Sequence, residues 1–121
     1  MYLSHINVTM PEHSEAIART FYTGQLGLRE LQRPEYADVQ DEVWFDAGGL
    51  ALHLSVEPQR KGADTQRHFG LGYGDVDGLQ ARLKAAGVEI ERGPAVPCKR
   101  FFVHDPFGNR IEIHAPGELH A

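Results

Sequence analysis

Apolar and polar residues alternate along several short segments of this chain, with the two-residue period of a β-strand. In residues 2–10 the apolar positions Ile6, Val8 and Met10 alternate with polar ones. Residues 50–56 repeat the alternation, with leucine at every second position. A strand of this kind has one apolar and one polar face, so each is expected to bury one side and to present the other to solvent or a ligand.

Two other segments carry apolar residues at the spacing of an α-helix. Ser14 is expected to cap the first helix, which ends within residues 24–27, and Asp75 the second, which ends at Gly87. Both helices should pack an apolar stripe on a sheet. The stripe of the first contains Ile17, Phe21 and Tyr22, and that of the second Val76, Leu79 and Leu83.

The complete pattern predicts the order β-α-β-β-β twice, an α+β fold made of two tandem modules. We place the modules at residues 1–57 and 66–116 of a single domain, 1–121, joined by a polar connector. The other expected strands span residues 28–32, 42–47, 68–74, 88–91, 100–104 and 109–114, and residues 33–41 are expected to form a loop.

The second half of the chain repeats the first. Each half opens with a histidine on its first strand, His5 or His68, and ends with a potential metal ligand on its last, His53 or Glu112. On the fifth strand His68 is followed by glycines on the polar face, which would leave room for a ligand. The arrangement predicts one metal site built from two half-sites. Asp46, Gly49, Leu52, His53 and Leu54 recur 59 positions later as Asp105, Gly108, Ile111, Glu112 and Ile113.

Composition narrows the possible partners. The 17 acidic and 12 basic residues give a net charge of −5, which argues against nucleic acid or an anionic membrane as a partner. No apolar run is long enough to span a bilayer, and the start lacks the pattern of a signal peptide. The single cysteine, Cys98, excludes an intrachain disulfide. These features favour a cytoplasmic protein.

Four motifs carry a resemblance that covers nearly the whole chain. The chain resembles the vicinal oxygen chelate superfamily: glyoxalase I, methylmalonyl-CoA epimerase, extradiol dioxygenases, fosfomycin-resistance thiol transferases and bleomycin-binding proteins. The closing run is a strong signal for the superfamily but a poor one for the reaction. The motifs are His5–Val8, Phe21–Tyr22 followed by Gln25–Leu28, His68–Phe69 followed by Gly74–Asp77, and Phe102–Glu112.

The resemblance implies a curved mixed sheet that forms a cup around a divalent metal ion. Carried over, the metal ligands are His5, His53, His68 and Glu112. Imidazole and carboxylate donors suit Zn, Ni, Co, Mn or Fe. In chains of about this length two copies usually pair, so the resemblance implies a homodimer whose sites are shared between subunits.

Five further residues are candidates for contacts with a small-molecule substrate, because the strand pattern directs them to the polar face. His114 has either a pocket role or a surface role. We expect His13 and His120 to lie on the surface and His104 to bind a turn. The candidates for substrate binding are Asn7, Thr9, Arg100, Phe102 and His114.

Three functions are compatible with these residues. A glyoxalase- or epimerase-like lyase or isomerase would act on adjacent substrate oxygens through a metal-stabilised enediolate, with Glu112 as the base. Relatives of that type carry Glu or Gln where this chain has His53. An Fe or Mn dioxygenase would use His5, His68 and Glu112, although His53 would then fill a position that oxygen needs. The third is a thiol-transferase or drug-binding resistance protein, without the arginine region that the transferases carry near the end.

Overall fold

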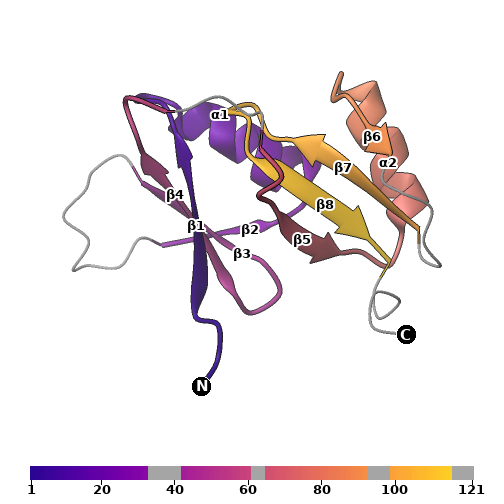
Figure 1. Cartoon of the computed structure of the whole chain (residues 1–121), viewed down its shortest axis with the longest axis horizontal. Coiled ribbons are helices and arrows are strands. Elements are labelled where there is room, and N and C mark those ends of the chain that lie inside the picture. Colours follow the sequence, from indigo (N-terminus) through magenta and orange to yellow (C-terminus); the bar gives the residue numbers. More distant parts are fainter. Residues whose placement is uncertain (33–41, 61–64, 93–98, 116–121) are drawn as a thin grey trace. The chain divides into compact units, whose positions relative to one another are not determined.

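A computed structural model describes residues 1–32, 42–60, 65–92 and 99–115. The chain divides into two compact units, Met1–Lys61 and Gly62–Ala121, and each is described by itself. Figure 1 labels their elements. The first unit contains β1 (His5–Met10), α1 (Glu15–Arg19), the π-helix η1 (Thr20–Gln25), β2 (Arg29–Leu31), β3 (Val43–Asp46) and β4 (Ala51–Val56). The second contains β5 (Phe69–Gly72), α2 (Val76–Ala85), β6 (Glu91–Arg92), β7 (Arg100–His104) and β8 (Arg110–His114).

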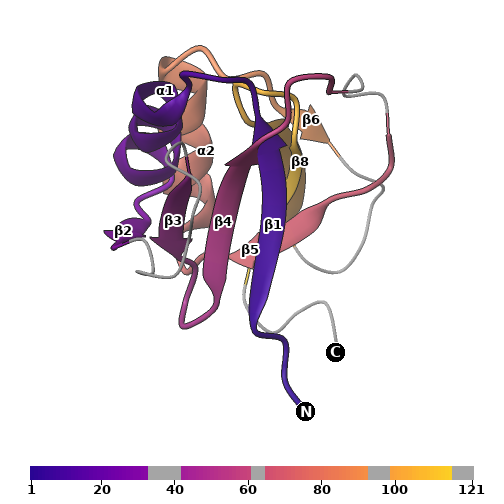
Figure 2. The same ribbon diagram turned by 90° about the vertical axis from the view of Figure 1, so that its left-hand side faces the viewer.

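Each unit has a four-stranded mixed sheet. The strand order is β1-β4-β3-β2 in the first unit and β5-β8-β7-β6 in the second. In both, the first and last strands pair in parallel and the remaining pairs are antiparallel. Figure 2 shows β1, β4 and β3 side by side, with α1 on one side of their sheet. The predicted α+β class and the repeated strand order are confirmed.

The core of the first unit follows the predicted alternation. On β4, Leu52 and Leu54 are buried while the residues between them are partly exposed. On β3, Val43 and Phe45 are buried on the same side, and Phe45 stacks on Tyr22 with ring centroids 5.2 Å apart. The polar face of β1 and β4 is therefore free of the core packing and can carry a site.

The first helix differs from the expectation. Ile17, predicted to face the core, is 52% exposed, whereas Ala18, Phe21 and Tyr22 are buried. The backbone widens from α1 into η1, and the Leu26 amide donates to the Phe21 carbonyl five residues back. The buried residues Ala18, Phe21, Tyr22 and Leu26 follow helical spacing, so the stripe that faces the core passes through Ala18 and leaves Ile17 on the surface. Ser14 stands at the expected cap position, but its side chain makes no capping bond.

Helix α2 agrees with the prediction. The Asp75 carboxylate accepts a hydrogen bond of 2.9 Å from the Gly78 amide, and Val76, Leu79 and Leu83 are buried. Gly87, with φ of +85°, ends the helix in a conformation that glycine adopts without strain. Nowhere in the described ranges is a helix both long and apolar enough to cross a membrane.

Several predicted strands are longer than the observed ones, because a strand ends where its hydrogen-bonded partner ends. The strand expected from residue 2 begins at His5, which pairs with the first residue of β4. The strand expected at residues 88–91 is instead Glu91–Arg92, which is shorter, lies further along the chain and pairs with two residues of β7. Strand β5 begins at Phe69, so His68 directly precedes it. The loop expected at residues 33–41, Cys98 and His120 lie outside the described residues.

The Asp-Pro-Phe-Gly-Asn segment between β7 and β8 forms a turn around one buried carboxylate. Asp105 is 4% exposed and accepts hydrogen bonds from the Phe107 and Asn109 amides and from the Asn109 side chain. Gly108 has a φ of +90°. The equivalent turn of the first unit is simpler: the Gly49 amide donates to Asp46, which lowers the pKa of that carboxyl. The most distinctive motif of the sequence is thus a structural turn.

The contrast between the two helices gives a test of the packing. Leu83→Ala should lower the free energy of unfolding by about 2–5 kcal/mol, because Leu83 is fully buried and its removal leaves a cavity. Ile17→Ala should change it by less than about 0.5 kcal/mol, because Ile17 lies on the surface. Urea denaturation of both variants measures this. A large loss for Ile17→Ala would contradict the observed orientation of α1.

Candidate metal-binding site

The two units place their predicted metal ligands at equivalent positions. In the first, Asn7 pairs with His53 across β1 and β4, and His5 lies two residues before Asn7. In the second, Gly70 pairs with Glu112 across β5 and β8, and His68 lies two residues before Gly70. Residues two apart share a face of a strand. Each unit therefore presents a diagonal pair of ligand candidates on one face of its sheet.

In the second unit, His68 and Glu112 form a half-site suited to a cation. His68 Nε2 lies 3.6 Å from Glu112 Oε1. His68 Nδ1 lies 2.8 Å from the Gln66 carbonyl oxygen, which can only accept, so Nδ1 carries the ring proton. Nε2 of the neutral ring then presents its lone pair next to the carboxylate. A backbone carbonyl bound to the far nitrogen is the usual support for a histidine that binds a metal.

Glu112 is buried and held by a cation. Glu112 is 6% exposed, and Arg100 Nη1 donates a hydrogen bond of 3.2 Å to Glu112 Oε1. Phe102, which pairs with Glu112 across β7 and β8, packs edge-on against His68 with centroids 5.2 Å apart. On the other side, the Arg110 guanidinium lies 3.8 Å from the Phe102 ring centre. These contacts fix the orientation of the carboxylate.

In the first unit, His53 is enclosed by three neighbours. Its ring stacks on Trp44 with centroids 4.0 Å apart and nearly parallel planes. The Asn7 amide donates to Nδ1 over 2.9 Å, an orientation supported by Ser55, which donates to the Asn7 carbonyl oxygen. This leaves the ring proton on Nε2, 3.1 Å from Glu42 Oε2.

The contact between His53 and Glu42 is close but not ideal. Nε2 and Oε2 are near enough for an ion pair, yet the angle between the groups is not that of a hydrogen bond. The His53 and Glu42 side chains are only 12% and 10% exposed. The role of His53 as a metal ligand stays a prediction.

His5 is exposed at the start of β1. Its Nδ1 lies 2.9 Å from the Ser4 hydroxyl, and its ring centroid is 6.3 Å from that of Trp44. Nε2 is therefore the nitrogen that would bind a metal. His5 and His53 lie on the same face, as predicted. The side chain that lies beside His53 Nε2, however, is that of Glu42.

Glu42 and Trp44 were not among the residues that the sequence singled out. Trp44 pairs with His53 as Phe102 pairs with Glu112, and Glu42 and Arg100 each lie two residues earlier. Both equivalent pairs are 58 positions apart in the sequence. The second unit thus holds a carboxylate with an arginine, and the first holds a histidine with a carboxylate. Extending the comparison of the two halves to their third strands would have found both residues.

The other predicted contact residues have structural partners. Thr9 donates to Glu57 and accepts from Arg60, so its hydroxyl is already used. His114 pairs across the sheet with Arg100, and its Nδ1 lies 2.9 Å from the Ala115 carbonyl oxygen. A Cβ built at Gly70 would lie 3.6 Å from the His114 ring, which therefore occupies part of the space expected beside the glycines. The role of these residues as substrate contacts stays a prediction.

The donor set fits a divalent metal in part. Within the described ranges no three His, Cys, Asp or Glu side chains gather around one point. Each unit instead supplies two ligand candidates on one face. The 3.6 Å between His68 Nε2 and Glu112 Oε1 is compatible with both binding one ion at about 2 Å. The second unit therefore supplies two ligand candidates for a metal ion, and His68 is in the tautomer that such a site needs.

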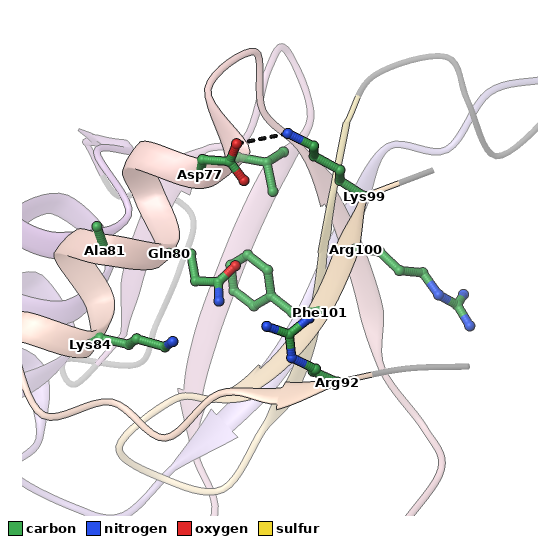
Figure 3. A pocket seen from close by; sticks show the side chains of 9 residues that line it. Asp77, Gln80, Ala81, Lys84, Arg92, Lys99, Arg100 and Phe101 are labelled. Carbon is green, nitrogen blue, oxygen red and sulfur yellow. Dashed lines mark hydrogen bonds and ion pairs between the residues drawn. The ribbon is translucent and has the colours of Figure 1, made fainter. Parts of the chain in front are cut away.

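Two hollows lie on the units, and none of His5, His53, His68 and Glu112 lines either of them. One, of about 490 Å³, lies between α2 and the start of β7, and Asp77 and Lys99 at its rim form an ion pair of 2.7 Å. Figure 3 shows Lys84, Gln80 and Arg92 around this hollow, with Arg100 pointing away from them. The other, of about 420 Å³, lies beside Glu42 and Trp44 and extends to Arg19 and Glu30.

Comparison with known proteins identifies the family. The model of the Glyoxalase/Bleomycin resistance protein/Dioxygenase superfamily matches residues 2–113. The chain belongs to this superfamily. The resemblance drawn from its motifs is confirmed. None of the curated proteins compared with the chain matches it.

Solved structures of other superfamily proteins have the same fold. A glyoxalase family protein from Bacillus anthracis is 32% identical, with a TM-score of 0.86 over 95% of this chain and 94% of its own. The fosfomycin resistance protein FosX from Listeria monocytogenes, in a complex with Mn(II) and sulfate, is 23% identical, with a TM-score of 0.73 over 94% and 89%. A glyoxalase family protein from Enterococcus faecalis is 21% identical, with a TM-score of 0.69 over 93% and 96%.

Proposed function

We propose that this chain is a divalent-metal-dependent lyase or isomerase of the glyoxalase or epimerase type. Its substrate would be a small molecule with two adjacent oxygens, from which a carbon-bound proton is removed to give an enediolate. The observation that carries the proposal is the pairing of His68 Nε2, whose lone pair is free, with the buried Glu112 carboxylate. Imidazole nitrogen and carboxylate oxygen are both donors that bind divalent metal ions.

His5, His68 and Glu112 would hold the metal. Two neutral imidazoles and one carboxylate suit Zn, Ni, Co, Mn or Fe, and FosX, a superfamily member, has been crystallised with Mn(II). When bound, the ion would act as a Lewis acid on the two substrate oxygens. Support for Glu112 as a ligand comes from its burial and from Phe102, which pairs with it across β7 and β8 and packs against His68.

The His53–Glu42 pair would move the proton. The sequence suggested Glu112 as the base, but a carboxylate that binds the metal is poorly placed for that task. His53 Nδ1, now bonded by Asn7, carries the lone pair that would take the proton, and Glu42 beside Nε2 would stabilise the imidazolium. An imidazole oriented by a neighbouring carboxylate is a common general base.

We also propose that two copies pair and that each metal site combines His5 of one subunit with His68 and Glu112 of the other. The support is the equivalence of the two half-sites, each of which offers one face of a sheet with an incomplete ligand set. Two-fold symmetry would then give two identical sites per dimer.

A second candidate function is an Fe or Mn dioxygenase. The observation that favours it is the position of His53, whose Nδ1 is hydrogen-bonded to Asn7 and whose Nε2 lies close to Glu42. With His53 so engaged, the metal would have two histidines and one carboxylate, and coordination positions would stay open for oxygen and a catechol. Oxygen uptake with catechols and fresh Fe²⁺ tests this function, and no uptake would exclude it.

Proton exchange in D₂O tests the proposed reaction. The protein, loaded in turn with each metal, should exchange the carbon-bound proton of a 2-oxo thiohemiacetal or a 2-methyl acyl thioester, followed by proton NMR. Glu42→Gln should slow exchange by about 10²–10⁴-fold without loss of metal. Glu30→Gln is the matched control, because Glu30 is an exposed carboxylate of the same unit that pairs with Arg19. No exchange with either substrate class and any metal would refute the proposal.

A further inference from the structure

Arg100 contacts the same carboxylate oxygen of the second unit that lies beside the candidate ligand His68. Arg100 Nη1 lies 3.2 Å from Glu112 Oε1, and His68 Nε2 lies 3.6 Å from the same oxygen. The guanidinium and the imidazole thus converge on one atom. A metal ion held by His68 and Glu112 would place a double positive charge near the guanidinium. Like charges at this distance repel strongly in a partly buried site.

The Arg100 side chain is poorly satisfied even with this contact. It is only 17% exposed, and its Nε is fully buried with no hydrogen-bond partner. Arginine keeps its charge at all physiological pH values and offers five N–H donors in a planar fork. A buried donor without an acceptor is unfavourable, and more so next to a charged group. The Nε of Arg100 therefore has no acceptor in the structure. After metal binding at Glu112, the side chain would have a greater need of an acceptor.

Neighbouring carboxylates of the same unit are used elsewhere. Glu91 pairs with Arg110, which lies over the Phe102 ring, and Asp77 pairs with Lys99. Figure 3 shows Arg100 pointing away from Asp77 and Lys99. Arg100 lies instead on the face of β7 and β8 that carries Glu112. Among the described residues, Glu112 is the one carboxylate that Arg100 contacts, so a bound ligand could supply a further acceptor.

We propose that Arg100 binds a negatively charged oxyanion group of the substrate and so determines its class. This inference rests on the proposed metal-dependent function. The substrate would combine two adjacent oxygens for the metal with a separate carboxylate, phosphate or phosphonate group for Arg100. Planar, bidentate hydrogen bonds from a guanidinium match such oxyanions well. Arg100 would exchange the Glu112 carboxylate for the substrate anion as the metal and substrate bind.

Matched ligands test this inference. Glycerol and glycerol phosphate carry the same adjacent hydroxyls and differ in the charged group, and 3,4-dihydroxybutyrate replaces the phosphate by a carboxylate. Calorimetric titration of the Mn²⁺-loaded protein should show that one or both anions bind at least about tenfold more tightly than glycerol. The two anions distinguish a phosphate site from a carboxylate site.

Variants of Arg100 provide the decisive comparison. Arg100→Gln should weaken anion binding about 10- to 100-fold, leave glycerol unchanged, and strengthen Mn²⁺ binding several-fold because a competing cation is removed. Arg100→Lys should recover part of the anion affinity, since it keeps the charge but loses the fork. Arg92→Gln is the control, because it removes the same charge from an exposed position of the same unit.

The outcomes separate the inference from the function on which it rests. Electron paramagnetic resonance of free and bound Mn²⁺ first measures metal binding. If the wild-type protein binds no Mn²⁺, the proposed function and this inference both fail. If it binds Mn²⁺ but does not prefer the anions, or if Arg92→Gln loses as much anion affinity as Arg100→Gln, the inference alone is overturned. Opposite changes in metal and anion affinity also exclude simple misfolding of Arg100→Gln.

Discussion

Replacement of His68 by alanine should abolish near-stoichiometric binding of a divalent metal. His68 presents the lone pair of Nε2 beside Glu112 and is fixed in that tautomer by the Gln66 carbonyl. Because loss of an outer-shell partner already costs about 10–100-fold in metal affinity, loss of this ligand should cost at least about 100-fold. Glu112→Gln should have a similar effect, since it removes the anionic donor. Metal analysis of freshly purified protein and calorimetric titration with each candidate ion measure both effects.

Two histidine variants complete this experiment. His104→Ala is the matched control, because His104 is exposed at the end of β7 and should not affect metal content. His53→Ala should also keep the metal, since the ring is bonded to Asn7 and lies beside Glu42, and should instead lose proton exchange. Loss of metal from His53→Ala would show that His53 is a ligand and would return the proton-transfer role to another residue. Metal retained by His68→Ala would refute the proposed site.

Mixing two inactive variants should restore part of the metal binding. His5→Ala damages only the first unit and His68→Ala only the second. If each site is shared between subunits, a hybrid dimer has one site with both defects and one with none. Random exchange of subunits should then recover about a quarter of the wild-type metal content from two preparations that each bind none.

The same mixture separates the possible assemblies. Native mass spectrometry of differently labelled variants shows whether hybrid dimers form. Hybrids without recovered metal would place both halves of the site in one chain, because every chain then carries a defect. A monomer in size-exclusion chromatography would refute the proposed dimer, whereas it would leave the choice of ligands to the alanine variants.

The sequence predicted most elements of this fold because their local signals agree. Alternation of leucine on β4, the Asp75 cap and the Gly87 stop all correspond to observed features. Strand ends were less predictable, since β6 extends only as far as its pairing with β7. The prediction for α1 was wrong for Ile17, because the stripe that faces the core passes through its apolar neighbour Ala18 instead.

The ligand candidates could be predicted for the same reason, since His5, His53, His68 and Glu112 stand at repeated positions. Their partners could not be, because those contacts depend on strand register. Glu42 reaches His53 only because Trp44 pairs with His53 on the adjacent strand. The contact between Arg100 and Glu112 also depends on register, because the Arg100 side chain crosses diagonally from β7 to Glu112 on β8.

The exchange of Glu42 for Arg100 at equivalent positions bears on how such a chain arises. A gene that encoded one half only would place the same residue in every copy, so an assembly of identical halves would repeat one charge. Duplication and fusion remove that constraint, because each copy then mutates independently. This chain has used that freedom: one half carries a carboxylate beside histidine, and the other a guanidinium beside carboxylate. A chain with two different halves can therefore place metal binding in one half and proton transfer in the other. An assembly of identical half-length chains cannot separate the two tasks in this way.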